Sequence, residues 1–483
     1  MKKPHLLLFL LAFATSVFAH DYQLVRSDRV CMYQFVYGNT DLNKYVGLRI
    51  DSVKQIGSDS LFYPNIHLQQ KGSYYRIDGS WIGKRVVVKA NGDNFIINSE
   101  NDSILIKTQS VLKDSWIVYK KNNVMKITAE VTGIEKKSFL DMEDSVKTIT
   151  FHVYDASMQP MPNQFEGSQI KISKNFGLIE SLPFYAFPNV ISDNQVLHCS
   201  LSGMTNPKVG VQNLTAEDIF DFQVGDEFHT VYAKGVSLGF ANKDSVMTIN
   251  RILERSSIGN NITYKIDVNE RHYQLDWSTQ VITNVVKQDT ISIDPFNIKF
   301  STLPGEIKVI TESENVQSVN MYADNSKSFR SMYLVNSGSG NWSEAIVTND
   351  MTCSDNVYYK GYGGPYYNCK GSFTYENRSL IYSKKGGVET GTKLVISSIP
   401  TVYIENSLKI SSTIGCKELT AKIASSELPA RLEVLSVSGT VVFGKSIDTE
   451  SSTISLQSLP AGAYLYRVRG DNGRVMGGKL ILK

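Results

Sequence analysis

Residues 431–437 read RLEVLSV, an alternation of apolar and polar side chains that is typical of a β-strand with one buried face. A Ser-Gly turn follows, and residues 440–445 (TVVFGK) return as a second strand. Residues 453–459 (TISLQSL) and 463–469 (AYLYRVR) repeat the alternation on either side of a Pro-Ala-Gly turn. This pattern predicts a small antiparallel β-sandwich at this end of the chain.

Strand signals also dominate the rest of the sequence. Residues 81–89 (WIGKRVVVK) and 94–97 flank an Asn-Gly pair, which is a strong hairpin signal. Many other short runs of Ile, Val and aromatic residues are separated by Asn, Asp, Gly and Ser. One helix is expected over 216–222, capped by Thr215. We therefore predict an all-β fold with several antiparallel β-sandwich-like domains.

The length of 483 residues suggests about three folded domains, at one domain per ~150 residues. Composition shifts and turn clusters suggest where these domains begin and end. The boundaries that we predict are a signal peptide at 1–19, a β-rich domain at 20–165, a β-rich domain with one short helix at 166–300, a Tyr- and Gly-rich β region at 301–400, and a C-terminal domain at 401–483.

The beginning of the chain has the pattern of a secretory signal. Lys2 and Lys3 precede the apolar run LLLFLLAF at residues 6–13, and cleavage is expected between Ala19 and His20. An uncleaved membrane anchor is the alternative, but the apolar run is shorter than the ~20 residues that span a bilayer. We therefore expect a mature protein outside the cytoplasm, either soluble or attached to the surface.

The charge of the chain argues against nucleic acid as a partner. Lys and Arg total 50 and Asp and Glu total 47, a formal net charge of +3. Removal of Lys2 and Lys3 with the signal leaves 48 against 47, so the mature chain has a net charge of +1 and no global field to hold a polyanion.

Five cysteines are too few for a disulfide scaffold in a chain of this length. Cys353 and Cys369 nevertheless stand sixteen residues apart in a chain that is expected to fold in an oxidising compartment. We predict a disulfide between them, worth roughly 3 kcal/mol of loop entropy.

Three spaced blocks in the last 80 or so residues resemble a known export signal. The sequence reads L-x-V-x-(S/D)-x-x-G-x-V-V, then I-x-L-x-x-L-x-x-G-x-Y-x-x-x-V, then G-x-x-x-x-x-K-L-I-x-K. In this order the blocks resemble the C-terminal sorting domain of type IX secretion (Por secretion system) cargo in Bacteroidota. The positions that match are Leu432, Val434, Gly439, Val441, Val442, Ile454, Leu456, Leu459, Gly462, Tyr464, Val468, Gly473, Lys479, Leu480, Ile481 and Lys483.

The resemblance implies an immunoglobulin-like β-sandwich that directs the chain through the periplasm and across the outer membrane. It implies the type IX secretion machinery and its sortase as partners, with surface lipopolysaccharide as a point of attachment if the protein is not released. Segments 225–229, 363–367 and 380–386 resemble uncharacterised secreted proteins of the same phylum, a likeness that supplies no activity.

No spaced catalytic set stands out in the body. A G-x-S-x-G match at 235–239 lacks the helix that a nucleophile elbow needs. The densest acidic cluster consists of Glu217, Asp218, Asp221, Asp226, Glu227 and His229. Asp226 and Glu227 could supply a base or calcium ligands, but the spacing fits no calcium loop, and Gly225-Asp226 favours a turn before a strand. No two histidines have zinc-ligand spacing. We predict no catalytic, metal or cofactor-binding residues from the sequence.

Seven tyrosines lie between Tyr358 and Tyr382, and tyrosine is well suited to a rigid binding surface with polar tips. The body is therefore expected to be a binding or structural module that contacts glycans or host proteins through Tyr-rich loops. A secreted hydrolase, either a glycosidase or a peptidase, is the alternative, because the two carboxylates of a glycosidase leave little trace in sequence.

Overall fold

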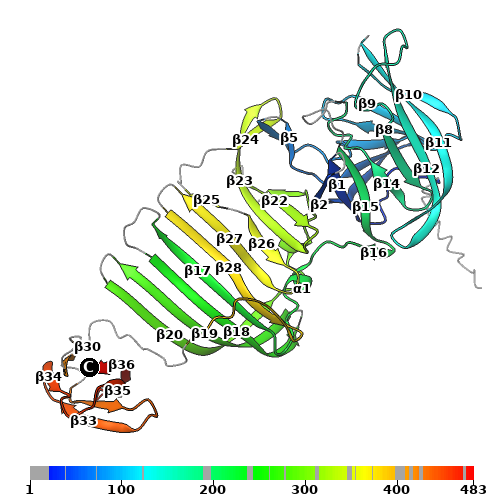
Figure 1. Ribbon diagram of the computed structural model, residues 1–483. Coiled ribbons are helices and arrows are strands. Elements are labelled where there is room, and N and C mark those ends of the chain that lie inside the picture. Colours follow the sequence, from blue (N-terminus) through cyan, green and yellow to red (C-terminus); the bar gives the residue numbers. More distant parts are fainter. Residues whose placement is uncertain are drawn as a thin grey trace, which may run out of the picture. The chain divides into compact units, whose positions relative to one another are not determined.

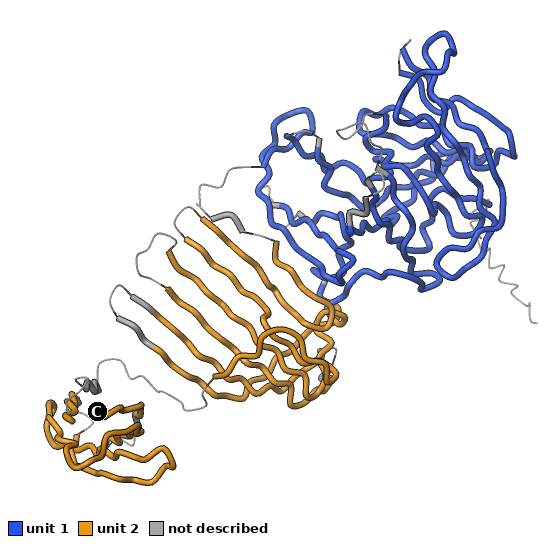
Figure 2. Tube along the Cα trace, in the orientation of Figure 1, with its two compact units in different colours: residues 1–215, 297–347 blue, residues 216–296, 348–483 orange. Residues whose placement is uncertain are grey.

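The structure is a computed structural model that divides into two compact units (Figure 2). Unit 1 comprises residues 1–215 and 297–347, and unit 2 comprises residues 216–296 and 348–483. The domain boundaries drawn from the sequence stay predictions. The structure describes residues 21–37, 40–71, 73–121, 124–188, 197–236, 243–259, 261–276, 279–309, 315–344, 351–353, 355–371, 374–396, 408–412, 417–423, 428–471 and 475–482.

The predicted all-β fold is confirmed (Figure 1), with two four-residue helices among the described residues. The helix predicted over 216–222 is shorter than expected, because α1 (Ala216–Ile219) ends before Phe220. Phe222 then packs into the core of unit 2 and is 8% exposed, which requires the chain to leave the helical path. The sequence analysis missed α2 (Ile298–Ser301), whose N-cap is the side chain of Asn297.

The larger sheet of unit 1 is antiparallel, and its strands β10 to β16 pair in sequence order. β1 pairs with both β2 and β15, and β2 also pairs with β22. A separate sheet in this unit has the strand order β3-β4-β7-β8-β9. The strands of unit 1 are β1 (Cys31–Tyr37), β2 (Thr40–Leu48), β3 (Ile50–Ile56), β4 (Asp59–Pro64), β5 (Gln69–Lys71), β6 (Tyr74–Arg76), β7 (Arg85–Val88), β8 (Asp93–Ile97), β9 (Ser103–Lys107), β10 (Ser115–Lys121), β11 (Met125–Phe139), β12 (Met142–Asp155), β13 (Gln169–Ser173), β14 (Gly177–Ser181), β15 (Leu197–Thr205), β16 (Lys208–Gly210), β21 (Ile307–Val309), β22 (Asn315–Tyr322), β23 (Ser326–Gly338) and β24 (Asn341–Glu344).

The core of unit 1 forms because apolar residues alternate along its strands. In β11 every second residue from Met125 to Val131 is buried, and β12 buries Phe151 against the same core. Trp81 is 2% exposed, and its ring meets that of Tyr33 edge-on with the ring centroids 4.9 Å apart. Val86, Ile96 and Ile104 of the separate sheet belong to the same buried cluster, so this core joins the two sheets of unit 1.

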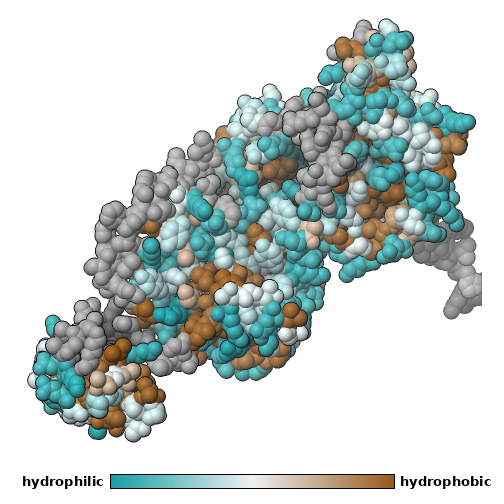
Figure 3. Space-filling view, in the orientation of Figure 1, coloured by the Kyte–Doolittle hydropathy of each residue, from teal (hydrophilic) through white to brown (hydrophobic). Residues whose placement is uncertain are grey.

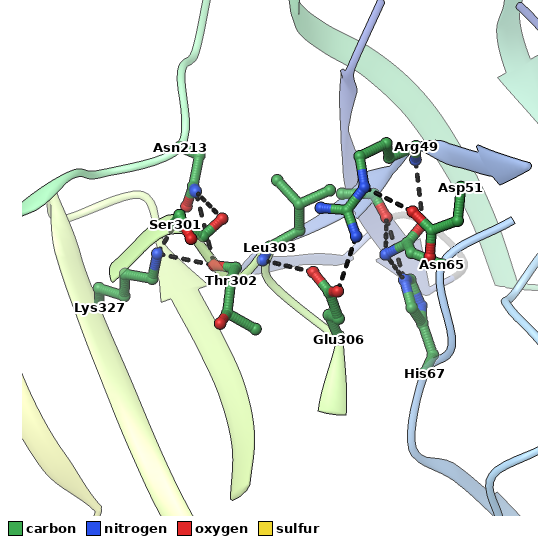
Figure 4. A network of polar contacts seen from close by, with 11 residues as sticks. Arg49, Asp51, Asn65, His67, Asn213, Ser301, Thr302, Leu303, Glu306 and Lys327 are labelled. Carbon is green, nitrogen blue, oxygen red and sulfur yellow. Dashed lines mark hydrogen bonds and ion pairs between the residues drawn. The ribbon is translucent and has the colours of Figure 1, made fainter. Parts of the chain in front are cut away.

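A buried lysine joins distant segments of unit 1 (Figure 4). The ammonium nitrogen of Lys327, on β23, lies 2.7 Å from Oδ1 of Asn213. It also lies 3.1, 2.6 and 2.8 Å from the carbonyl oxygens of Leu214, Phe300 and Thr302. The side chain is 0% exposed, so these oxygens replace the water that the charge loses on folding. Lys327 therefore fixes α2 and the end of the 197–215 segment against β23.

A second group of polar residues lies nearby in the same view (Figure 4). Arg49 donates from Nη2 to Oε1 of Glu306 at 2.8 Å, and its backbone N–H donates to Oδ1 of Asn65 at 2.9 Å. Nε2 of His67 lies 2.9 Å from Nδ2 of Asn65 and 3.0 Å from the carbonyl oxygen of Gly47. Burial lowers the pKa of His67 to about 3, so the ring is neutral in the folded protein.

Unit 2 contains a sheet of long antiparallel strands, which run side by side in Figure 1. Neighbours in this sheet are β20–β19, β19–β18, β18–β17, β17–β28 and β28–β27. The strands are β17 (Glu227–Val236), β18 (Lys243–Ile258), β19 (Asn261–Asp276), β20 (Thr279–Ile293), β25 (Met351–Cys353), β26 (Asn356–Tyr359), β27 (Gly363–Gly371), β28 (Thr374–Lys385) and β29 (Val388–Gly391).

This sheet is covered over only part of its length. In β19, residues 262, 264, 266 and 268 are buried and the residues between them are half-buried, as expected when one face meets a core. Residues 269–273 are half-buried without alternation, and so are residues 245–248 of β18. Within the part of the chain that the structure describes, no second layer covers the sheet beyond this core, and both of its faces are partly exposed there; we call this part the single layer.

The last strands form the predicted C-terminal sandwich. One sheet has the order β30-β31-β34 and the other has the order β33-β32-β35-β36. The strands are β30 (Leu408–Ser412), β31 (Glu418–Ile423), β32 (Ala430–Leu435), β33 (Val441–Ile447), β34 (Ser451–Ser455), β35 (Gly462–Arg469) and β36 (Val475–Leu482).

The variant Lys327→Met tests the role of the buried ammonium. Methionine fills similar space but donates no hydrogen bond, so the carbonyl oxygens around it lose a partner in a place that water does not reach. We expect unit 1 to lose about 2–4 kcal/mol of unfolding free energy, measured by urea denaturation of the full chain. The control Lys120→Met removes an exposed lysine from the same unit. If Lys327→Met and Lys120→Met lost the same unfolding free energy, the buried ammonium of Lys327 would not be a stabilising contact.

The variant His67→Gln tests the neutral buried imidazole. The folded pKa of about 3 lies below the usual value of 6.5, so the unfolded chain binds the extra proton first as the pH falls. His67 should therefore make the unfolding free energy fall between about pH 6.5 and pH 3, with a slope approaching ~1.4 kcal/mol per pH unit. The variant should lack this contribution, so its stability should fall less steeply with acid. If the unfolding free energies of the wild type and the variant change with pH in the same way, His67 is not the source of the acid sensitivity.

Candidate functional site

The C-terminal sandwich has a core of its own. Leu432 and Val468 face each other across β32 and β35, and they are 0% and 1% exposed. Leu419 of β31 and Ile454 of β34 belong to the same buried cluster, so side chains from both sheets meet in it. Seven apolar positions of the three sequence blocks are therefore core positions of a folded sandwich: Leu432, Val434, Ile454, Leu456, Leu459, Val468 and Leu480. Val441, Val442 and Ile481 are exposed at 48%, 42% and 71%.

Two glycines of the predicted sorting motif lie at chain turns. Gly439 has φ +87° in the turn between β32 and β33, a conformation that side chains other than glycine's rarely adopt. Its N–H donates to the carbonyl oxygen of Ser436 at 2.9 Å, which closes the turn. Gly462 begins β35, directly after the turn that follows Leu459.

The other motif residues lie on β35 and β36. Tyr464 donates its hydroxyl hydrogen to the carbonyl oxygen of Pro460 at 2.9 Å, which ties β35 to the turn before it. Val468 is in the core, and Lys479 is exposed opposite Leu465. The remaining predicted positions, Lys483 and the cleavage pair Ala19 and His20, lie outside the described residues, as do the central serine of the G-x-S-x-G match and Cys416.

Three members of the acidic cluster are folded into the interior of unit 2, whereas Glu217 is exposed and Asp218 and Asp221 are half-buried. Asp226, Glu227 and His229 are 2%, 7% and 0% exposed. Oδ2 of Asp226 accepts from the backbone N–H of Gln223 at 2.8 Å and from the ammonium of Lys385 at 3.2 Å. The sequence analysis placed Asp226 in a turn, and its carboxylate closes that turn from inside the protein.

The carboxylate of Glu227 and the neutral imidazole of His229 form a hydrogen-bonded pair, and the remaining polar atoms of both side chains bind other protein groups. The backbone N–H of Leu394 donates to Nδ1 of His229 at 2.9 Å, so Nε2 carries the hydrogen and donates to Oε1 of Glu227 at 2.6 Å. Oε2 of Glu227 accepts from Nε of Arg251 at 2.6 Å. Each polar atom of the two side chains thus has a protein partner, and both side chains are buried.

The pKa values agree with this structural role. Burial raises the pKa of Glu227, but the hydrogen bonds from Arg251 and His229 outweigh it and leave the pKa below its usual range. Burial lowers the pKa of His229, and Glu227 opposes this shift without reversing it. Glu227 is therefore an anion that forms an ion pair with Arg251, and His229 is a neutral, buried imidazole on β17.

The seven tyrosines predicted to lie in loops lie mostly on strands. Tyr358, Tyr366 and Tyr382 are buried at 6%, 9% and 3% exposure, so these three contribute to packing. The half-buried members are Tyr359, Tyr362, Tyr367 and Tyr375. The expectation of Tyr-rich loops is corrected in this respect, because the stretch folds as β26, β27 and β28.

One row of side chains combines tyrosines from distant parts of the sequence. Arg378 of β28 faces Tyr232 of β17 on one side and Tyr367 of β27 on the other. Residues that face each other directly across antiparallel strands point to the same side of the sheet. All three side chains are half-buried. Because adjacent strands lie ~4.8 Å apart, the two tyrosines are about 10 Å apart with the guanidinium between them.

A carboxylate completes this row, which we call the Tyr-Arg row. Glu376, two residues before Arg378, accepts a hydrogen bond at 3.0 Å from the hydroxyl of Tyr367. Burial and then Glu376 raise the pKa of Tyr367 to about 12, and they also raise the pKa of Tyr232. Both hydroxyls are therefore protonated donors near the carboxylate. Together the four residues offer aromatic faces, a cation and an anion on one surface.

Figure 3 shows hydrophobic residues gathered near one end of unit 2, with paler and hydrophilic colours over much of the strands beyond it. This agrees with the change from alternating to uniform burial along β18 and β19. Sequence reasoning missed Tyr232, Glu376 and Arg378, because β17 and β28 are distant in the chain and only their pairing brings these residues together.

Comparison with known proteins assigns the C-terminal sandwich. The family model described as a secretion system C-terminal sorting domain matches residues 406–483. No curated protein matches the chain. Among the residues described, no helix has both the length and the apolar character to cross a membrane.

Two crystal structures from B. thetaiotaomicron align with nearly the whole chain but with little similarity. One is the extracellular domain of a protein described as a one-component system, with 8% identity, coverage of 93% of this chain and 91% of that chain, and a TM-score of 0.13. The other is described as the extracellular domain of a hybrid two-component system, with 7% identity, coverage of 96% and 98%, and a TM-score of 0.12. TM-scores this low support no statement about the body.

The predicted sorting domain is thus confirmed by its sequence match and by a folded sandwich whose core uses the matching residues. Export to the cell surface or beyond follows from it. Residues 406–483 belong to the family of secretion system C-terminal sorting domains, and the chain is an exported protein that carries one.

Proposed function

We propose that the body of this exported protein is a binding module for a glycan or a protein, and that the Tyr-Arg row of unit 2 is its contact surface. The supporting observation is the placement of Tyr232, Arg378 and Tyr367 in one cross-strand row on the single-layer part of the sheet. Tyrosine brings a large contact area with few rotatable bonds, and arginine adds directional donors. A rigid strand scaffold holds the row in place before the ligand arrives, which limits the entropy lost on binding.

The same proposal places the protein on the type IX secretion route, with its machinery and sortase as partners, in a member of the Bacteroidota. Surface lipopolysaccharide is the proposed attachment if the protein stays on the cell. Cleavage of a signal peptide between Ala19 and His20 is the proposed first step of this route.

A hydrolase receives less support from the described residues. Asp226 and Glu227, the acids singled out in the sequence, are bound by protein donors, and Glu227 is paired with Arg251. A general acid or base must reach a substrate proton, which these side chains do not do. We therefore favour the binding module over the glycosidase or peptidase.

A Cys353–Cys369 disulfide is part of the proposal. The register of β25 and β27 places these two residues directly opposite each other. Facing residues in an antiparallel pair have Cα atoms ~4.5–5.5 Å apart, which is within the range of a disulfide. Such a crosslink would fasten β25 to the sheet beside the Tyr-Arg row.

Ligand binding by the Tyr-Arg row is tested with the double variant Tyr232→Ala/Tyr367→Ala. Glycan and protein arrays probed with the full chain should first identify the ligand class. The double variant should then bind that ligand with an affinity lower by about 1–3 kcal/mol, roughly 5–150-fold. The matched control is Tyr273→Ala, which removes a half-buried tyrosine from the opposite face of the same sheet. Unchanged affinity in the double variant would refute the assignment of this face.

The disulfide is tested by peptide mapping of the protein alkylated without reduction. We expect a crosslinked peptide pair containing Cys353 and Cys369, with Cys31 and Cys199, which are free and buried, recovered as alkylated thiols after denaturation. Reduction should lower the unfolding free energy by roughly 3 kcal/mol. Alkylation of Cys353 and Cys369 in the unreduced sample would exclude the bridge.

A further inference from the structure

Among the described residues, β20 is a long edge strand of the unit 2 sheet. It has 15 residues, and β19 pairs with it from Thr279 to Ile293. No register places another described strand along its outer edge. An edge of this length offers a row of backbone N–H and C=O groups to any strand that aligns with it.

The side chains of β20 do not hide this edge. Residues 286–292 are all exposed, and Val286 and Ile291 are 50% and 36% exposed. β-Branched residues make up much of the strand, which favours pairing. The described part of the strand therefore has both the backbone groups and the side chains that a neighbouring strand needs.

The charges of β20 select one particular partner. Lys287 and Asp289 lie on the same face, two residues apart, and their side chains are 3.4 Å apart and about half exposed. They are the only charged residues between Thr279 and Ile293. In an antiparallel pair of two β20 strands centred on Gln288, Lys287 of each copy faces Asp289 of the other. Opposite charges that face each other across strands stabilise the pair, whereas like charges destabilise it.

The two neighbouring registers place like charges opposite each other. Centring the pair on residue 287 would place two lysines opposite each other, and centring it on residue 289 would do the same with two aspartates. The register centred on Gln288 also brings β-branched side chains of the two copies opposite each other. It places Val285 opposite Ile291 and Val286 opposite Thr290, which are β-branched pairs suited to a sheet.

From this self-complementary pattern we infer that β20 joins a second copy of this chain, and that the sheet of unit 2 continues across a two-fold axis through Gln288. The resulting dimer presents two Tyr-Arg rows on the same side of one continuous sheet, because a two-fold axis perpendicular to a sheet preserves its faces. The inference does not depend on whether those rows bind a ligand. If they do, two linked sites raise the apparent affinity for a repetitive ligand.

Crosslinking of the full chain tests this register. In the proposed dimer, the Cα atoms of the two Gln288 residues lie about 5 Å apart, whereas those of the two Thr290 residues are offset by four positions and lie beyond ~13 Å. Gln288→Cys should give a disulfide-linked dimer under mild oxidation, because bridges need Cα atoms within ~7 Å. Thr290→Cys, on the same face and equally exposed, is the matched control and should behave like the wild type.

A charge swap tests the same contact without added thiols. Lys287→Glu should weaken the dimer by tenfold or more in sedimentation equilibrium, because it sets like charges opposite each other. The double variant Lys287→Asp/Asp289→Lys should restore the wild-type dimer, since it exchanges the two charges within each pair. Circular dichroism should confirm that each variant is folded.

Any one of three results would overturn the inference. The first is a wild-type chain that sediments as a monomer at every concentration up to the solubility limit. The second is equal crosslinking through positions 288 and 290, and the third is a dimer that is indifferent to Lys287→Glu. Loss of ligand binding in the tyrosine variants with the dimer intact would concern the proposed function alone.

Discussion

The strands of the unit 2 sheet are longer than the core that covers them, and both the Tyr-Arg row and the exposed edge of β20 depend on this excess length. A sheet gains most of its stability where one face is removed from water, as happens for alternate residues between 262 and 268 in β19. Beyond that stretch, hydrogen bonds and cross-strand side-chain pairs hold a single layer. The covered half anchors the strands, so the uncovered half keeps a defined shape while both of its faces remain available.

This arrangement separates the tasks of the chain. The C-terminal sandwich buries seven apolar residues of its motif in a core of its own and supplies the signal for export. Unit 1 uses buried polar contacts, above all those of Lys327, to join segments that are distant in sequence. The acids of the 226–229 segment serve the same structural purpose in unit 2. The surfaces that remain exposed, the Tyr-Arg row and the edge of β20, are the ones suited to partners.

The sequence predicts elements whose signals are local. The hairpin at Asn91-Gly92 joins β7 and β8 as expected, and Gly92 adopts φ +85°. Strand length is harder to predict where burial stops alternating, as in the 16-residue β18, which continues through polar residues of the single layer. The Tyr-Arg row was not predictable, because no local pattern reveals that β17 pairs with β28. The partners of Glu227 and His229 were not predictable for the same reason, because Arg251 and Leu394 are distant from them in the chain.

Hydrogen–deuterium exchange of the full chain, read peptide by peptide, measures most directly whether the single layer is folded. The account predicts that amides in residues 243–248 and 269–274 exchange faster than those in 262–268, yet far more slowly than an unstructured chain, because they are hydrogen-bonded in the sheet without a covering layer. Exchange at the unprotected rate would contradict it, since a surface that is not folded in advance does not hold the Tyr-Arg row or a pairing edge in place.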